Sequence, residues 1–287
     1  MLESSTIQLL RFHFSLFLMP VYWFALSQCT NIQLNDALLV GFILHMLVYP
    51  SSNGYNSYMD RDTGSIGGIE HPLPPSKQLY FVTLAMDLIA VLLSLCISTI
   101  FATGILLYIL ASRAYSYRGI RIKKYPIWGF LVVMLLQGAV TFFLVLHGVS
   151  TDKTLIIPWQ GMAAASLLIG SFYPLSQIYQ HQQDREDGVN TISYLLGYKG
   201  TFYFSALLFA AANLLLWILL TNQGKVTGFF MLQLFLLPVT AYFLWWFFQV
   251  CKNIKAASYR NTLYMNIIAS ICCNAGFIFL LINTNSE

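Results

Sequence analysis

Charged residues are scarce in this sequence. Only 9% of its 287 residues are Asp, Glu, Lys or Arg, whereas 57% are hydrophobic. Soluble domains carry roughly 25% charged residues, so most of this chain cannot form a water-exposed surface. The formal net charge of +4 is too small to indicate a nucleic-acid partner. The composition therefore predicts a membrane protein, for which the lipid bilayer is the main solvent.

Two other patterns are missing. The five cysteines lie in or beside apolar runs, with neither the spacing of metal ligands nor that of a disulfide framework. The N-terminal residues lack the marks of a cleaved signal peptide, because Glu3 lies where positive charge is expected and no A-x-A site precedes Cys29. We therefore expect residues 12–29 to be retained as a first membrane helix.

What the sequence does contain is long apolar runs. A membrane-spanning helix needs about 20 such residues. The content of Leu, Ile, Phe and Ala in these runs, without turn residues, favours helices over the strands of a barrel. The runs fall at residues 12–29, 34–52, 79–101, 103–117, 127–148, 158–178, 201–221, 228–250 and 263–283. We predict an all-α, polytopic membrane protein of nine transmembrane helices.

The basic residues are distributed unevenly between the two sides. With nine spans, every Lys and Arg except Lys153 and Lys225 lies on the side of the N-terminus. The positive-inside rule makes that side cytoplasmic, at the plasma (inner) membrane. The segments predicted to lie there are 53–76, 113–126, 180–200 and 251–262. One central helix more or fewer would destroy the asymmetry, which supports the count of nine.

One segment of the chain occurs twice. Residues 49–64 (YPSSNGYNSYMDRDTG) align without a gap to residues 173–188 (YPLSQIYQHQQDREDG), and seven of the sixteen positions are identical. Both copies begin at a helix end on the same side, which indicates an internal duplication of four-helix units about an axis normal to the membrane. We place the halves at roughly 12–125 and 127–250, with a final helix at 263–283, in a single domain of residues 1–287.

Polar residues recur at helical spacing within each copy. Asn53, Asn56 and Asp60 share one face if the second helix continues as far as Asp60. The same positions of the second copy hold Gln177, Gln180 and Asp184. Two such faces meeting across the pseudo-twofold axis would form a site of carboxylate and amide oxygens, which are ligands that suit Mg²⁺.

Basic residues are expected beside this site. They are Arg61 and Arg185 within the copies, and Arg118, Arg121, Lys123 and Lys124 after the fourth helix. Guanidinium and ammonium groups match phosphate, so acids and bases at one mouth favour a metal-bridged diphosphate. The alternative is that each Asp-Arg-acid segment is a solvated helix end followed by Gly64 or Gly188. The presence of two copies on one side of the membrane weakens that alternative.

These motifs resemble those of the UbiA-type intramembrane prenyltransferase superfamily, whose members have nine membrane helices. Asn56 and Asp60 match the family motif N-x-x-x-D-x-x-x-D after the second helix, and Asp184 matches D-x-x-x-D after the sixth. Other similar segments are His71-Pro72-Leu73 for a family R-P-L, Gly188 to Thr191 for G-x-x-T, and Tyr117 with Arg121 for a tyrosine and a base. The resemblance covers nearly the whole chain.

The chain departs from the family pattern at three positions. Gly64 and Gln180 stand where the family has aspartates, and His71 stands where it has an arginine. The candidates to compensate for the missing carboxylates are Asp62, Glu186 and Asp187. We therefore expect a single Mg²⁺, or a shifted site, rather than the two-metal arrangement that the resemblance would otherwise imply.

The resemblance implies an enzyme that binds a prenyl diphosphate with Mg²⁺ and transfers the prenyl group to a lipophilic acceptor, which is aromatic in most of the family. Asp60 and Asp184 would be the catalytic metal ligands, and some of the aromatic residues would line a prenyl tunnel. The other metal-site candidates are Asn56, Asp62, Gln180 and Asp187. The candidates for substrate binding are Asn53, Arg61, Gln177, Arg185, Tyr117, Arg121, Lys123 and Lys124.

Two other functions stay open at this point. A related terpene cyclase would share the ionisation step, after which the cation would attack its own chain. A transporter is the alternative of another class, since duplicated membrane halves are common among transporters.

One acid lies inside a predicted span. Asp87 falls within residues 79–101, and an intramembrane acid is a candidate functional residue. A protonated carboxyl that hydrogen-bonds a neighbouring helix is the structural alternative.

Overall fold

The computed structural model describes residues 2–284, and helices make up most of this part of the chain. In chain order they are α1 (Ser4–Leu10), η1 (Phe12–Phe17), α2 (Met19–Ser27), α3 (Leu34–Phe42), η2 (Ile43–Val48), α4 (Tyr49–Asp60), α5 (Lys77–Ser94), α6 (Thr99–Ser116), η3 (Ile122–Lys124), α7 (Pro126–Met134), η4 (Leu135–Val140), α8 (Thr141–Val149), α9 (Trp159–Gln177), η5 (Ile178–Gln180), α10 (His181–Glu186), α11 (Ile192–Asn222), α12 (Val226–Lys252), η6 (Ile254–Ala256) and α13 (Tyr259–Thr284). The η2 and η4 segments are π-helical, and the other η segments are 3-10 helices.

Eight helical stretches of the described chain are long and apolar enough to cross a membrane. They are Ser4–Ser27, Leu34–Asp60, Lys77–Ser94, Thr99–Ser116, Pro126–Val149, Ile192–Asn222, Val226–Lys252 and Tyr259–Asn283. A ninth long helix, α9, has 19 residues and is less apolar because its sequence includes polar residues such as Ser166, Ser171 and Gln177. These three side chains are buried inside the bundle. The predicted fold class, a polytopic all-α membrane protein, is confirmed.

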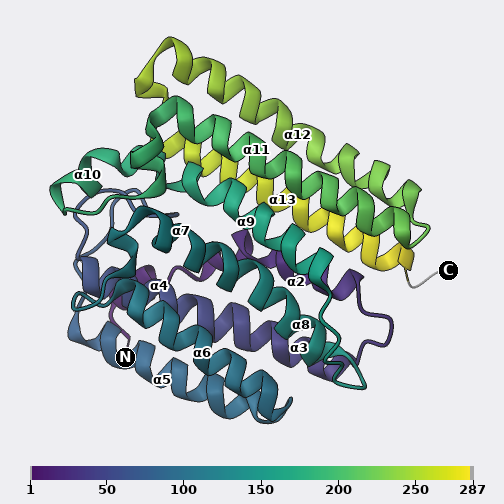
Figure 1. Ribbon diagram of the computed structural model, residues 1–287. Helices are drawn as coiled ribbons and strands as arrows, with labels where there is room; N and C mark the ends of the chain where they lie inside the picture. Colours follow the sequence, from purple (N-terminus) through teal and green to yellow (C-terminus); the bar gives the residue numbers. More distant parts are fainter. Residues whose placement is uncertain (1, 285–287) are drawn as a thin grey trace.

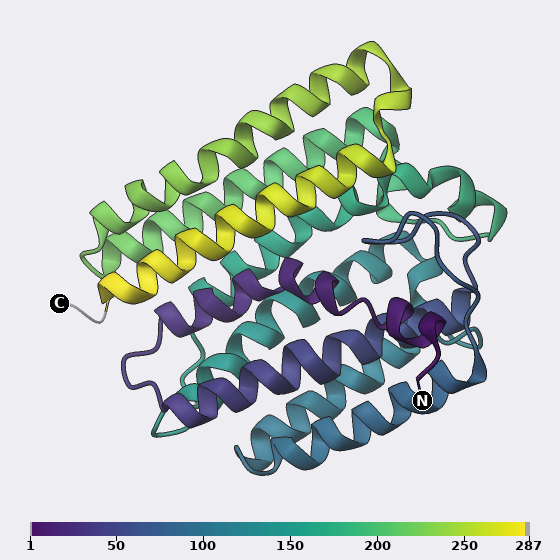
Figure 2. The same ribbon diagram turned by 180° about the vertical axis from the view of Figure 1, so that it is seen from behind.

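The helices run side by side in a layered bundle (Figure 1). The helices α11, α12 and α13 pack together on one side, and α4, α5 and α6 pack together on the other. The helices α2, α7, α8 and α9 lie between them, as the reverse view also shows (Figure 2). The loop after α4, the α6–α7 connection and α10 all lie at one end of the bundle, on the left of Figure 1. The polar segments of the sequence are therefore gathered at one end.

Two predicted spans have different boundaries in the structure. The first span is broken at Arg11, which has left-handed backbone angles (φ 49°) between α1 and η1, and helix already begins at Ser4. The span predicted at 79–101 ends at Ser94. There a tight turn leads into α6, whose first turn is capped by the Ser98 hydroxyl accepting from the Phe101 amide at 3.0 Å. Both differences arise from local contacts that hydropathy does not record.

Candidate functional site

A cavity of about 300 Å³ lies between the layers of helices. Carboxylates, amides and bases line the part next to the loops, whereas rings and aliphatic side chains from α2, α6, α9 and α13 line the rest. Phe24, Tyr108, Phe172 and Phe277 are among these rings. The residues proposed from sequence that line the cavity are Asn53, Asn56, Asp60, Asp62, Lys123, Gln177, Gln180, Asp184 and Asp187. The two copies of the repeat thus meet at one cavity.

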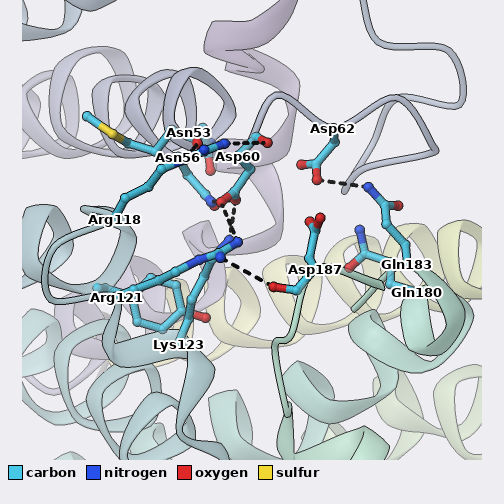
Figure 3. A network of polar contacts seen from close by, with 12 residues as sticks. Asn53, Asn56, Asp60, Asp62, Arg118, Arg121, Lys123, Gln180, Gln183 and Asp187 are labelled. Atoms are coloured by element: carbon cyan, nitrogen blue, oxygen red, sulfur yellow. Dashed lines mark hydrogen bonds and ion pairs between the residues drawn. The ribbon is translucent and has the colours of Figure 1, made fainter. Parts of the chain in front are cut away.

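The first copy reaches the cavity because its helix does not end where hydropathy falls. Helix α4 continues as far as Asp60, as the predicted polar face requires. The Asn56 amide Nδ2 donates to Asp60 Oδ2 at 2.9 Å, one helical turn away. The Lys123 ammonium also contacts Asp60 Oδ2, and Arg121 Nη2 lies 3.7 Å from Asp60 Oδ1 (Figure 3). The Asp60 side chain is only 4% exposed, so these bases balance a buried charge.

Two arginines of the α6–α7 connection contact the copies of the repeat. Arg121 Nη1 donates to the backbone oxygen of Asp187 at 3.4 Å, so this side chain lies between Asp60 and the second copy (Figure 3). Arg118 Nε donates to the Met59 carbonyl at 2.7 Å, at the C-terminus of α4. A cation at this end of a helix is favoured by the helix dipole. Arg118 therefore stabilises the helix end rather than the cavity wall.

The second copy reaches the cavity along a bent path. Helix α9 ends at Gln177, and the chain passes through η5 before α10 presents Asp184. The Thr191 hydroxyl donates to Asp184 Oδ2 at 3.2 Å. Burial raises the pKa of the Asp184 carboxyl to about 7. The acid of the second copy is thus in a less favourable environment for its negative charge.

Asp62 belongs to the first copy and contacts a residue of the second. Gln183 Nε2 donates to Asp62 Oδ1 at 2.8 Å (Figure 3). Burial, and then the neighbouring carboxylate of Asp60, raise the pKa of Asp62 to about 6. Crowded, desolvated carboxylates of this kind are stabilised in the charged form by a cation.

The donor set fits a divalent cation that is shared with a phosphate ligand. Four carboxylates line the cavity, and the buried Oδ1 of Asp60 has no hydrogen-bond partner. Across residues 2–284, however, no three His, Cys, Asp or Glu side chains converge closely enough to hold a metal by themselves. Mg²⁺ is commonly held by one or two carboxylates together with substrate phosphates and water. Asp60, Asp62, Asp184 and Asp187, with the amides of Asn56 and Gln180, match that mode.

Arg121 contacts Asp60 but does not itself line the cavity. Four other proposed substrate-binding residues are also absent from the cavity wall. They are Arg61, Tyr117, Lys124 and Arg185. Arg61 has left-handed backbone angles after α4 (φ 56°), so its guanidinium lies over the Tyr58 ring instead. Tyr117 follows the last residue of α6 and is 49% exposed. The Lys124 ammonium lies over the Tyr125 ring, and Arg185 is exposed on α10.

A tyrosine pair lines the cavity close to the position proposed for Tyr117. Two residues earlier, the hydroxyl of Tyr115 contacts that of Tyr173, and Gln177 Nε2 donates to the Tyr173 hydroxyl at 2.9 Å. The residues on α6 that line the cavity, Tyr108, Ser112, Tyr115 and Ser116, follow helical spacing. That spacing from Tyr108 is the signal that would have identified Tyr115.

Sequence reasoning also missed Arg11. This side chain is 8% exposed and lines the cavity, where it donates to the Gly67 and Asn53 carbonyls at 3.3 and 3.1 Å. Its Nε is buried and has no hydrogen-bond partner. The sequence offers one sign of this role, because Arg11 is a lone cation next to an apolar span and such charges usually face the protein interior.

The loop after α4 closes over the cavity next to Gln183. Gln180 Nε2 donates to the Ser65 carbonyl at 3.1 Å, and Ile66 and Gly67 line the cavity. A Cβ atom at Gly64 would lie 2.8 Å from Gln183 Oε1. That atom is the end of a flexible side chain, so a carboxylate at position 64 would require only a movement of the Gln183 side chain.

Comparisons with known proteins agree with this architecture. Residues 16–268 match the model of the UbiA prenyltransferase family. A UbiA homolog from Archaeoglobus fulgidus bound to DMAPP and Mg²⁺ is 18% identical, with 99% of each chain covered and a TM-score of 0.72. A structure of a UbiA homolog from the same organism bound to GPP and Mg²⁺ has 18% identity, coverage of 99% and 100%, and a TM-score of 0.71.

Two further matches differ in extent. The apo structure of a UbiA homolog from Aeropyrum pernix K1 is 20% identical, with 94% of this chain and 98% of that chain covered and a TM-score of 0.69. At these identities the structural matches show the fold alone. A stretch of 77 residues is 32% identical to Oligopeptide transporter 6 of Arabidopsis thaliana, covering 26% of this chain and 10% of that protein. The match thus spans about a tenth of that relative's length, which is too little to indicate its function.

Proposed function

The chain belongs to the UbiA prenyltransferase family, and from this premise we propose that it transfers a prenyl group from a prenyl diphosphate to a lipophilic, aromatic acceptor. The observation that supports this most is the division of the cavity wall into a charged part and an apolar part. Acids and bases gather at the loop end, and an apolar, aromatic chamber continues from it. A prenyl diphosphate has the same division, with a charged head and an apolar tail.

Mg²⁺ is the cofactor that we propose for the charged end. Asp60 and Asp184 would be its main ligands, supported by Asp62, Asp187 and the neighbouring amides. The relatives bound to DMAPP or GPP together with Mg²⁺ favour this assignment. When bound, the ion would neutralise negative charge on the departing diphosphate.

The residues of this chain would bind the diphosphate, stabilise the prenyl cation and exclude water from it. Lys123 and Arg121 already contact a carboxylate at the loop end, and cations placed there would bind phosphate oxygens as charge accumulates on them. The rings of Tyr108, Phe172 and Tyr173 line the adjoining wall. Their faces would stabilise an allylic cation, while the apolar wall would keep water from capturing it.

We also propose that the site faces the cytoplasm. Every Lys and Arg except Lys153 and Lys225 lies on the predicted cytoplasmic side, and the loops of that side gather at one end of the bundle (Figure 1). By the positive-inside rule this end is cytoplasmic. Substrate made in the cytoplasm would then enter at the acid-bearing end.

The test is diphosphate release from prenyl diphosphates by the purified protein in lipid nanodiscs. We expect release that requires Mg²⁺ and a prenyl tail, and a prenylated product that requires an aromatic acceptor. Cyclic or linear terpenes formed without an acceptor would assign the chain to the cyclase alternative. No release with any chain length would contradict the proposal. The Asp152→Asn variant, altered at a loop away from the cavity, is the matched control and should behave as wild type.

A further inference from the structure

A buried ionic cluster lies outside the cavity, on the opposite face of the helix that carries Asp60. Arg113 of α6 donates from Nε to Asp87 Oδ2 of α5 at 2.9 Å, and its Nη2 contacts the same oxygen. The two side chains are 15% and 13% exposed. Asp87 therefore does not line the cavity and instead pairs with an arginine of the neighbouring membrane helix.

The ion pair continues onto α4. Arg113 Nη2 donates to the Ser51 hydroxyl oxygen at 2.9 Å, and the Ser51 hydroxyl lies 2.6 Å from Asp87 Oδ1. The carbonyl of Thr83 lies within 2.9 Å of Ser51 Oγ. The Arg113 guanidinium also lies 3.9 Å from the centroid of the Tyr55 ring, one turn further along α4. We call Ser51, Tyr55, Thr83, Asp87 and Arg113 the Arg113 cluster.

The cluster and the cavity occupy opposite faces of α4 and adjoining faces of α6. None of the five cluster residues lines the cavity, whereas Asn53, Asn56 and Asp60 of α4 do. On α6, Ser112 lines the cavity next to Arg113 and contacts Ser52 of α4 at 2.5 Å between the hydroxyl oxygens. The cluster thus fixes α4 relative to α6, and α6 leads into the connection that carries Arg121 and Lys123.

The sequence of α4 explains why such fixation is needed. Its twelve residues, YPSSNGYNSYMD, include three serines, two asparagines, a glycine and a proline. These residues are poor helix formers. Serine and asparagine favour competing hydrogen bonds, glycine loses more entropy on ordering, and proline lacks an N–H and clashes with the preceding turn. At Gly54 the helix lies so close to α5 that a Cβ atom would come within 2.9 Å of the Thr83 side chain. Tertiary contacts must therefore hold the acid-bearing end helical.

The second half of the chain provides an internal comparison. The positions 124 residues after Ser51, Thr83, Asp87 and Arg113 hold Leu175, Leu207, Ala211 and Leu237. The fifth cluster residue, Tyr55, has an identical counterpart in Tyr179, so the second copy lacks the ion pair and its serine but keeps the ring. In that copy the α-helix ends at Gln177, and residues 178–180, which correspond to 54–56, form a 3-10 turn. The copy with the ionic cluster stays α-helical to its aspartate, and the copy without the cluster does not.

We infer that the Arg113 cluster is a positioning device, which holds α4 helical up to Asp60 and sets Asp60 against Lys123. Its residues are positioning residues and do not touch substrate. The kinetic part of the inference rests on the proposed function, whereas the part that concerns the conformation of α4 does not.

The test separates positioning from general stability by removing the cluster in two ways. Ser51→Ala with Tyr55→Leu removes the α4 contacts and leaves the ion pair in place. Asp87→Leu with Arg113→Met removes the ion pair without leaving a buried charge unpaired, so it should restore most of the thermal stability that either single substitution loses. Asp36→Asn is the matched control, because Asp36 pairs with Lys153 at 2.6 Å at the other end of the bundle.

The readouts are hydrogen exchange of the amides of residues 54–60 and the Mg²⁺ concentration that gives half-maximal diphosphate release. In both double variants we expect these amides to exchange at least about tenfold faster, as for lost hydrogen bonds to a charged group. We also expect half-saturation to need several-fold more Mg²⁺, with the control unchanged in both measurements. Should the Asp87→Leu/Arg113→Met protein fail to fold, Ser51→Ala alone is measured against the same expectation.

Two results would overturn the inference. One is wild-type exchange at residues 54–60 after the cluster contacts have been removed, which would mean that α4 holds its conformation without them. The other is an equal shift in Asp36→Asn, which would mean that any lost ion pair has this effect. If the wild-type protein releases no diphosphate, the proposed function fails, and the exchange measurement alone decides the inference.

Discussion

The two copies of the repeat bring an aspartate to the same cavity in different electrostatic surroundings. In the first copy, Asp60 ends a regular helix and is contacted by Lys123 and Arg121. In the second, Asp184 follows a 3-10 turn and accepts a hydrogen bond from the neutral hydroxyl of Thr191. Burial raises the pKa of Asp184 to about 7. The duplication has kept the position of the acids but not their partners.

This difference indicates how one site can be built from two unequal halves. The bases of the α6–α7 connection occur once and lie against the first copy, so the charge of Asp60 is already balanced. The charges of Asp62, Asp184 and Asp187 are not balanced in this way, and a divalent cation would stabilise them most. We therefore expect a metal shared by Asp60 and Asp184 to be stabilised most by the acids that lack a basic partner, with the phosphate-binding bases on the side of Asp60.

Loss of either aspartate should have the largest effect. Asp60→Asn and Asp184→Asn should each lower the rate of diphosphate release by about 10²–10³, the effect of removing one electrostatic stabiliser of a transition state. Circular dichroism and the thermal midpoint should show folded protein in each variant. A large loss in one variant only would mean that the copies are not functionally paired.

Replacement of a base that contacts the first copy should have the next largest effect. Lys123→Met should raise KM for the prenyl diphosphate by about 10–100-fold, because a hydrogen bond to a charged group contributes about 1.5–3 kcal/mol. Its neighbour provides the control, since the Lys124 ammonium lies over the Tyr125 ring outside the cavity. Lys124→Met should leave KM unchanged, and equal effects at the two positions would contradict the placement of the bases.

An added carboxylate in the second copy should change the metal dependence more than the rate. Gln180→Asp restores the charge that the family motif has at this position, and Gln180 lines the cavity. The extra charge should either recruit a second Mg²⁺ or repel the diphosphate, so the Mg²⁺ titration of diphosphate release must change in midpoint or steepness. An unaltered titration would show that residue 180 does not face the metal.

The smallest effect is expected at the neutral partner of Asp184. Thr191→Val removes the hydrogen bond to Asp184, which contributes about 0.5–1.5 kcal/mol, so diphosphate release should slow by about 2–10-fold. It also removes the N-cap acceptor of the Tyr194 amide at the start of α11, so the thermal midpoint is measured alongside the rate. Thr103→Val, at an exposed position of α6 where the hydroxyl bonds its own helix, should have no effect. A loss as large as that of Asp184→Asn would mean that Thr191 itself touches the reacting group.

The polar face of the first copy could be predicted because it depends on local geometry. Helical spacing places Asn53, Asn56 and Asp60 on one face wherever the segment is helical, and the repeat then identifies Asp184. Eight of the predicted spans likewise correspond to long apolar helices in the described part of the chain. Both results follow from patterns that can be read along the sequence.

Other parts of the site depend on contacts between distant segments. Arg11 itself has left-handed backbone angles, and it interrupts the first span where its side chain reaches the cavity. Gln183 donates to Asp62 from α10, which follows the 3-10 turn η5. The family motif predicts Tyr117, but this residue follows the end of α6 and is exposed, whereas Tyr115 lines the cavity. Spacing along the chain does not encode where a helix breaks, so these residues could not be placed from sequence.

The central claim is that Asp60 and Asp184 act on one metal–diphosphate unit, and a double-mutant cycle tests it most directly. The rate of Mg²⁺-dependent diphosphate release would be measured for wild type, Asp60→Asn, Asp184→Asn and the double variant. Residues that act as a unit are strongly non-additive, so the double variant should be about as slow as the slower single variant. A double variant whose loss equals the product of the two single losses would place the aspartates in independent sites and contradict the account.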